Sequence, residues 1–220
     1  MIKYTEIDFT KSIFYYNEDF LSEIEQKELI DEIESYDMKL YPNSTRKMIW
    51  LDKNNRKYDF SRIKLDGEEF KENINKITNK INNFINEIFS KMIECDKIIN
   101  YESILINKYD GHHSGIGWHS DNEECIPENS IIVSISLGCE RDFEIKRMNE
   151  KEREYECKKT NIEFISNPFY KDEMHRYKLK SGSIFIMAGS SQKYWYHQLP
   201  KYKKKKDNEI RYNLTFREYK

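Results

Sequence analysis

The chain has 220 residues, 38% hydrophobic and 14% aromatic, which is enough apolar material for the core of one large domain and excludes disorder over most of its length. With 37 basic and 39 acidic residues, the formal net charge of −2 excludes a globally basic nucleic-acid-binding protein but not a local basic patch. No apolar run could span a membrane and the first ten residues lack a signal-peptide core, so we expect a soluble intracellular protein of the nucleus or cytoplasm.

Two helices are predicted in the first half of the chain. Ser22 and Glu25 form a capping box ahead of an apolar-periodic segment. Apolar residues then recur every three or four positions from Phe70 to Ile88, which indicates one long amphipathic helix. A coiled coil would show the same stripe, but it lasts under three heptads, so packing against a sheet is favoured.

Strands are expected on either side of the longer helix. Lys47–Trp50 and Lys57–Ser61 are interpreted as a short strand pair joined by a turn at residues 52–55. Most of the glycines lie between residues 111 and 189, which indicates tight turns between strands in the second half. The strands predicted there are Ser103–Tyr109, Ser130–Leu137, Asp142–Met148, Arg176–Lys180, Ser183–Ala188 and Arg211–Arg217. Many short strands are typical of a sandwich or barrel, and the polar stretch Asn149–Asp172 is taken as a long hairpin or an insertion.

One histidine and one carboxylate lie close together after the first of these strands. His119 and Asp121 form an H-x-D pair, whose spacing on a strand end puts both side chains on one face. A second histidine, His197, follows near the C-terminal end. Two histidines and a carboxylate are the facial triad of non-haem Fe(II) oxygenases, which leaves open positions for a co-substrate and O₂. Taken alone, the pattern also occurs by chance or in a structural role.

The last predicted strand strengthens the metal interpretation. Alternation sends Arg211, Asn213, Thr215 and Arg217 to one face, and inside a barrel two arginines would be buried charges without partners. A small dicarboxylate between them would fit, because a guanidinium binds a carboxylate through two hydrogen bonds. Asn107-Lys108-Tyr109 adds an inward-facing amide and phenol. The competing interpretation is an exposed edge strand with both arginines in water.

The ordered motifs N-x-Y, H-x-D, W-Y-H-x-L-P and R-x-N-L-T-F-R resemble the AlkB-type 2-oxoglutarate- and Fe(II)-dependent dioxygenases, in particular the nuclear DNA-repair homologues. The resemblance runs from about Arg46 to Arg217. It implies an α+β fold with a mainly β core, a double-stranded β-helix (jelly roll) with N-terminal helices and a nucleotide-recognition lid. Residues 1–100 would form the helical extension and lid, and residues 101–220 the dioxygenase core, as one structural unit.

The resemblance also implies roles for single residues. Fe(II) would be bound by His119, Asp121 and His197, which would also be the catalytic set. Around 2-oxoglutarate would lie Asn107, Tyr109, Arg211, Asn213, Thr215 and Arg217. Substrate contacts would come from Arg46, Tyr58, Phe60, Ser61, Asn122 and Glu123. Phe60 would stack on a flipped base and Asn122-Glu123 would face its edge, although Tyr58 and Phe60 could equally be core aromatics. The related enzymes carry an acidic residue where this chain has Asn122.

The implied activity is oxidative removal of N-alkyl lesions, N1-methyladenine and N3-methylcytosine, from DNA or RNA. The cofactors would be Fe(II), 2-oxoglutarate and O₂, with ascorbate as reductant in vitro, and the products formaldehyde, succinate and CO₂. The partner would be alkylated nucleic acid, with single-stranded DNA favoured over RNA or duplex. The protein would act as a monomer and would not contact a membrane. Two alternatives stay open: an oxygenase acting on a protein or lipid, and a non-catalytic nucleic-acid-binding protein.

Three further features receive modest interpretations. His112 and His113, in a glycine-flanked loop, are expected to contact solvent or phosphate rather than a metal. The lysine run Lys201–Lys206 is a solvated hairpin tip, a phosphate-binding patch or a nuclear-localisation signal. The four cysteines share no C-x-x-C spacing, so free thiols are expected rather than disulfides or a zinc knuckle.

Overall fold

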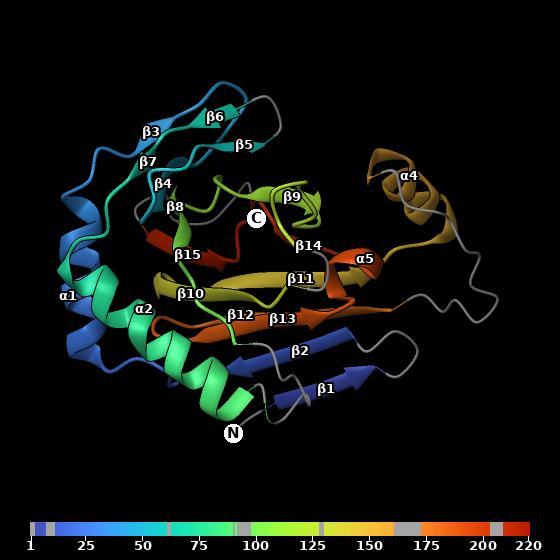
Figure 1. Cartoon of the computed structure of the whole chain (residues 1–220). Coiled ribbons are helices and arrows are strands. Elements are labelled where there is room, and N and C mark those ends of the chain that lie inside the picture. Colours follow the sequence, from blue (N-terminus) through green and yellow to red (C-terminus); the bar gives the residue numbers. More distant parts are fainter. Residues whose placement is uncertain are drawn as a thin grey trace.

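Figure 1 shows the computed structural model of the chain, a layered arrangement of two β-sheets flanked by helices. The structure describes residues 3–7, 12–60, 63–89, 91, 98–127, 130–160, 173–202 and 209–220, with the backbone alone for 3–7, 60 and 157–160.

The larger sheet runs through the whole molecule. Its strands are, in spatial order, β1 (Lys3–Ile7), β2 (Ser12–Asn17), β13 (Ile184–Gly189), β10 (Ile132–Gly138), β15 (Ile210–Arg217), β8 (Ser103–Asp110), β4 (Lys47–Asp52) and β3 (Lys39–Leu40), with β7 (Gly67–Glu68) added beside β4. Neighbours are antiparallel except β4 and β7. β15 therefore lies centrally, between β10 and β8, although it comes late in the sequence.

A second sheet of four strands faces the first. Its order is β12 (Met174–Leu179), β11 (Arg141–Arg147), β14 (Trp195–Leu199) and β9 (Ile116–His119). Apolar side chains from both sheets meet between them, among them Phe185 of β13, Ile145 of β11 and Trp195 of β14. Two facing antiparallel sheets with this crossed connectivity are a jelly roll, so the predicted fold class is confirmed.

The outer face of the larger sheet is covered by two helices, as the sequence predicted. α1 (Glu23–Glu34) is capped by Ser22, whose hydroxyl accepts from the Glu25 backbone while the Glu25 carboxylate accepts from the Ser22 backbone. α2 (Glu72–Phe84) continues as one π-helical turn, Ile85–Phe89, and its buried isoleucines pack on the sheet rather than on a partner helix in a coiled coil. Figure 1 shows both helices on one side of the molecule.

The strand pair expected around residues 52–55 does not form. β5 (Tyr58–Phe60) pairs with β6 (Ile63–Leu65), and β4 pairs instead with β3, β7 and β8. Trp50 of β4 is 1% exposed and stacks on Tyr58 of β5, so the two-stranded β5–β6 unit packs against the face of β4 and does not pair along its edge.

Strands at the N-terminus were not predicted. In β2, Ile13 and Tyr15 enter the core beneath the helices, while Phe14 and Tyr16 enter the core between the sheets. Because both faces are buried, no polar alternation marks the strand. β2 and β4 pair with β13 and β8, so residues before and after position 100 share one sheet.

Two short helices lie near the smaller sheet. α4 (Glu150–Thr160) occupies the first part of the segment expected to be a hairpin or insertion, and residues 161–172 lie outside the described part. α5 (Ser191–Tyr194) connects β13 to β14. Within the described residues, no helix has the length and apolar character needed to cross a membrane.

Candidate active site

The three predicted metal ligands lie together at the end of the smaller sheet, two on its strands and one in the loop after β9. His119 ends β9 and is the register partner of His197 on β14, which brings their ring centroids within 4.2 Å. Asp121 follows two residues after β9, and its carboxylate oxygens lie 4.0 Å from His119 Nε2 and 3.9 Å from His197 Nε2. The ligand atoms of all three converge within 4.8 Å, so one ion could touch each of them.

Burial sets the protonation state that metal binding requires. It lowers the pKa of His119 and lowers the pKa of His197 to about 3, so both imidazoles are neutral at neutral pH. His119 Nδ1 lies 2.8 Å from the Gly117 carbonyl oxygen, which can only accept, so the ring proton resides on Nδ1 and the Nε2 lone pair faces the other ligands.

Arg217 neutralises the carboxylate of the triad. Burial alone would raise the pKa of Asp121, but the Arg217 guanidinium, 2.7 Å from Asp121 Oδ1, and the imidazoles lower it to about 2. Arg217 also donates to the Tyr58 hydroxyl. The expectation that both β15 arginines lack ionic partners is therefore wrong for Arg217, because the loop after β9 returns Asp121 to the end of β15.

Arg211 is the arginine that matches the expectation. It is 1% exposed, and its NH2 group donates to the hydroxyl of Ser136 at 2.8 Å. Its Nε has no hydrogen-bond partner, and among the described residues no carboxylate lies within ion-pair distance. Burial lowers the pKa of Arg211 to about 10, so it remains a cation at neutral pH.

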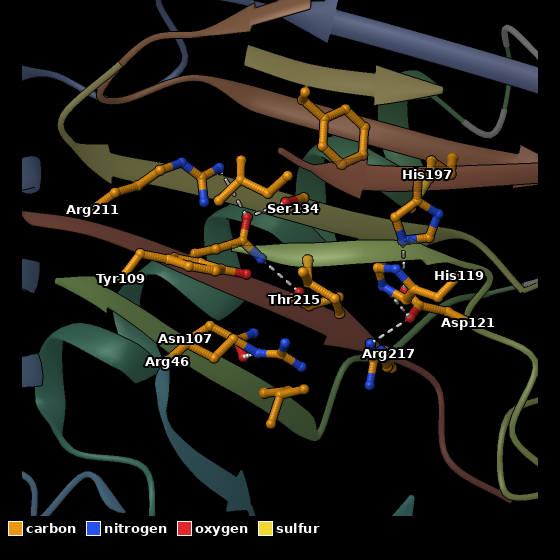
Figure 2. Close-up of a pocket in the computed structure, with 16 residues that line it drawn as sticks. Arg46, Asn107, Tyr109, His119, Asp121, Ser134, His197, Arg211, Thr215 and Arg217 are labelled. Carbon is orange, nitrogen blue, oxygen red and sulfur yellow. Dashed lines mark hydrogen bonds and ion pairs between the residues drawn. The ribbon is translucent and has the colours of Figure 1, made fainter. Parts of the chain in front are cut away.

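Arg211 and the three predicted metal ligands line one pocket between the two sheets. In Figure 2, Arg211 lies at one end and the His119, Asp121 and His197 group at the other. Every predicted 2-oxoglutarate residue lines the pocket: Asn107 and Tyr109 from β8, and Arg211, Asn213, Thr215 and Arg217 from β15. The alternation deduced for the last strand is thus confirmed. Apolar walls are added by Leu105, Phe143, Met187 and Leu199.

Three polar residues of the site escaped the sequence analysis. Ser134 and Ser136 alternate along β10; Ser134 donates to Asn213 Oδ1 at 2.6 Å and Ser136 accepts from Arg211. Gln192 of α5 accepts from the Asp121 backbone at 2.8 Å and so holds the loop that carries the carboxylate. Serines at every second position of a predicted buried strand were the available signal for the first two; Gln192 had none.

The predicted substrate residues are distributed unevenly. Arg46 lines the pocket, and its Nε donates to Asn107 Oδ1 at 2.6 Å. Tyr58 is fully buried and stacked on Trp50 at 4.5 Å, so its ring belongs to the core behind the pocket, the alternative left open for it. Phe60 lies in β5 with its side chain outside the described part, and Ser61 lies outside the described residues.

Asn122 and Glu123 follow the triad carboxylate directly. Asn122 donates to Glu156 of α4 at 2.8 Å. Glu123 accepts from the Tyr58 hydroxyl at 2.8 Å through Oε1, while its Oε2 is buried without a hydrogen-bond partner. Among the described residues, no donor therefore satisfies this second oxygen of the carboxylate.

These groups fit the cofactors of the fold. Neutral imidazoles and an ionised carboxylate that converge on one point are the ligand set of Fe(II) oxygenases. The orphaned Nε of Arg211, in the same pocket, requires an anion for compensation, and a carboxylate is the partner that a guanidinium binds best.

Comparisons with known proteins agree with this site. The family profile described as the 2OG-Fe(II) oxygenase superfamily matches residues 14–217. The chain is 35% identical over 121 residues to the DNA oxidative demethylase ALKBH2 of Arabidopsis thaliana, a match that covers 53% of this chain and 37% of the relative. It is 32% identical over 117 residues to the human alpha-ketoglutarate-dependent dioxygenase alkB homolog 3, covering 53% and 36%. The matches thus span little more than a third of these relatives.

A solved structure of OsALKBH1 superposes over the whole of both chains with a TM-score of 0.63 at 19% identity, which shows a shared fold. Since the superfamily profile matches nearly the whole chain, the protein belongs to the 2-oxoglutarate- and Fe(II)-dependent oxygenases, enzymes that use Fe(II), 2-oxoglutarate and O₂, and is of the AlkB type.

Proposed function

We propose that this protein is an oxidative demethylase that removes N-alkyl groups from the bases of DNA or RNA, with N1-methyladenine and N3-methylcytosine as substrates. The observation that carries the proposal is the pocket itself, with the converging triad at one end and the unpaired Arg211 cation at the other. The printed activity of the relative from Arabidopsis thaliana, DNA oxidative demethylase, supports the substrate class.

When bound, Fe(II) with 2-oxoglutarate and O₂ supplies an oxidant that hydroxylates a C–H bond while 2-oxoglutarate becomes succinate and CO₂. A hydroxylated N-methyl group then leaves as formaldehyde and restores the base. Within the protein, the iron would be held by His119, Asp121 and His197. Arg211 would bind the carboxylate of 2-oxoglutarate that lies farther from the iron. Arg217 would keep Asp121 ionised, and Gln192 would hold its backbone in place.

Glu123 supports a cationic base as the substrate. Both proposed lesions carry a positive charge at neutral pH, and a carboxyl group with an unsatisfied buried oxygen attracts such a group. Flipping a base out of a duplex costs a few kcal/mol of lost stacking and pairing, and this cost is smallest for a lesion that cannot pair. We expect the protein to prefer single-stranded DNA over RNA and over duplex DNA. We also expect it to act as a monomer.

Mass spectrometry of an alkylated oligonucleotide tests the proposal. Single strands that carry N1-methyladenine or N3-methylcytosine are incubated with the protein, Fe(II), ascorbate and 2-oxoglutarate. The expected result is loss of one CH₂ unit of mass that requires 2-oxoglutarate. Succinate release without any mass change would instead indicate a protein, a lipid or another lesion as the substrate.

Matched variants separate chemistry from folding. Asp121→Ala should abolish both succinate release and demethylation. Asp66→Ala, which removes a carboxylate that is 83% exposed in its ion pair with Lys57, should leave both unchanged. Demethylation that persists in Asp121→Ala would overturn the metal-ligand assignment.

A further inference from the structure

A second group of metal-binding side chains lies outside the active site. His112, Cys139 and Glu209 bring one nitrogen, one sulfur and one oxygen atom within 4.8 Å of one another. Cys139 Sγ lies 3.1 Å from Glu209 Oε2, and His112 Nε2 lies 3.8 Å from the same oxygen. A tetrahedral zinc ion with bonds of about 2.0–2.3 Å places its ligand atoms roughly 3.3–3.7 Å apart. The two separations to Glu209 Oε2 lie just below and just above that range, and the third, between His112 and Cys139, is within 4.8 Å.

The three residues come from the ends of three neighbouring strands. His112 follows β8, Cys139 follows β10 and Glu209 precedes β15, the strand between them. The backbone already draws these ends together, since Gly111 N–H donates to Glu209 O and Cys139 N–H donates to Ile210 O. Gly138 has φ of +80°, and a Cβ there would lie 2.4 Å from Ile210 O, so this close approach requires glycine.

The three side chains differ in burial, from the buried His112 to the half-exposed Glu209. His112 is 5% exposed, which corrects the expectation that it contacts solvent or phosphate. Cys139 is half-buried, and the Glu209 side chain is 49% exposed. The histidine and thiol are thus positioned from inside the protein, while the carboxylate leaves a path for an ion and for a water ligand in the fourth position.

Charge and ligand type then select the metal. On binding, the Cys139 thiol would lose the proton that it now directs at Glu209, and thiolate and carboxylate together would cancel a charge of 2+. Without a metal, burial and the Glu209 carboxylate raise the pKa of the Cys139 thiol to about 11, and the cations of Arg141 and Arg211 offset only part of this shift. The bound ion itself would therefore displace the proton. Mixed sulfur, nitrogen and oxygen ligands in tetrahedral geometry are typical of Zn²⁺, whereas Fe(II) in the active site would meet only nitrogen and oxygen.

We propose that His112, Cys139 and Glu209 form a second, zinc-type metal site that ties together the ends of β8, β10 and β15. The site does not depend on the substrate proposed above. It lies beside the register row that pairs Arg211 with Tyr109 and Gly138, so an ion there would brace the Arg211 end of the pocket.

Co²⁺ is the probe that distinguishes the two sites. Metal-free full-length protein is titrated with Co²⁺ under reducing, anaerobic conditions while the near-ultraviolet thiolate-to-cobalt charge-transfer band is recorded. Only a site with a cysteine ligand gives that band. It should appear in the wild type and in His119→Ala, and disappear in Cys139→Ser. Cys125→Ser, which removes the other thiol described, is the matched control and should keep it.

Competition with Zn²⁺ and a variant of Glu209 provide two further tests of the site. Added Zn²⁺ should bleach the band, because zinc displaces cobalt from such ligands. Glu209→Gln alters a half-exposed side chain and should raise the apparent Kd for Co²⁺ about tenfold or more, while circular dichroism confirms the fold. No band in the folded wild type, or a band that survives Cys139→Ser, would overturn the proposal and leave a hydrogen-bonded cluster only.

Discussion

Arg211 and Arg217 occupy equivalent positions on one strand, yet their surroundings give them different roles. Arg217 is ion-paired with Asp121 at 2.7 Å and acts through a metal ligand. Arg211 has hydroxyl and amide neighbours, which hydrogen bond to a cation without neutralising it. Alternation along the strand predicted that both side chains enter the pocket. It could not predict their partners, because Asp121 reaches Arg217 through a loop whose path the sequence pattern does not encode.

Arg211→Met should therefore weaken 2-oxoglutarate binding specifically. The variant keeps the volume of the side chain but removes charged hydrogen bonds worth about 1.5–3 kcal/mol, so KM for 2-oxoglutarate should rise roughly 10- to 100-fold. Succinate release measured against 2-oxoglutarate concentration checks this. Arg176→Met, which changes an arginine whose side chain is 56% exposed, is the control. An unchanged KM in Arg211→Met would assign the carboxylate to another residue.

At the level of elements, Asp52 joins the end of β4 to β8 and to the turn before β5. Its side chain is 0% exposed. Ser103 Oγ, its neighbour on β8, donates to it at 2.6 Å, the backbone N–H groups of Asn54 and Arg56 donate at 2.9 and 3.0 Å, and the Arg56 side chain forms an ion pair at 3.0 Å. The network therefore joins β4, β8 and the turn that leads into β5.

Asp52→Ala should lower the free energy of unfolding by about 3–5 kcal/mol, because it leaves the buried donors without their partner. Burial opposes ionisation, but Arg56, Ser103 and the backbone donors lower the pKa of Asp52 below its ordinary value. Its contribution is therefore complete above the unfolded pKa of about 3.9 and is lost as pH falls through the lower folded pKa. Urea unfolding at several pH values measures both effects. A loss no greater than that of the exposed variant Asp66→Ala would contradict them.

Several of the elements that the sequence predicted have one polar face, and β13 was also predicted, as an apolar run between turn residues. β15 and β8 alternate because one face lines a polar pocket, and α2 has an apolar stripe because its other side meets water. β2 is buried on both faces and went unrecognised. The partners of β4 and β5 were assigned wrongly because pairing is decided by tertiary packing, here that of Trp50 on Tyr58, and not by the turn between the strands.

For the whole molecule, the pocket between the sheets couples ligand binding to stability. Metal ligands come from the smaller sheet and most 2-oxoglutarate residues from the larger one, so bound cofactors link the two. With Mn²⁺ in place of Fe(II) to prevent turnover, 2-oxoglutarate at about 100 times its Kd should add about 2.7 kcal/mol, a Tm increase of roughly 5–10 °C. Scanning fluorimetry measures it. An equal increase in His197→Ala would show that binding does not use the triad.

The place of β15 in the sheet bears on how the protein is made. Of the strands described, it is synthesised last, yet it lies between β10 and β8 and supplies Arg211, Asn213, Thr215 and Arg217 together. While residues 210–217 are still inside the ribosome, β8 and β10 have no common neighbour, so their edges are exposed to other chains. A nascent chain released before this point would lose the middle of its larger sheet and four of its six 2-oxoglutarate residues in one step, and would become a substrate for chaperones and proteases.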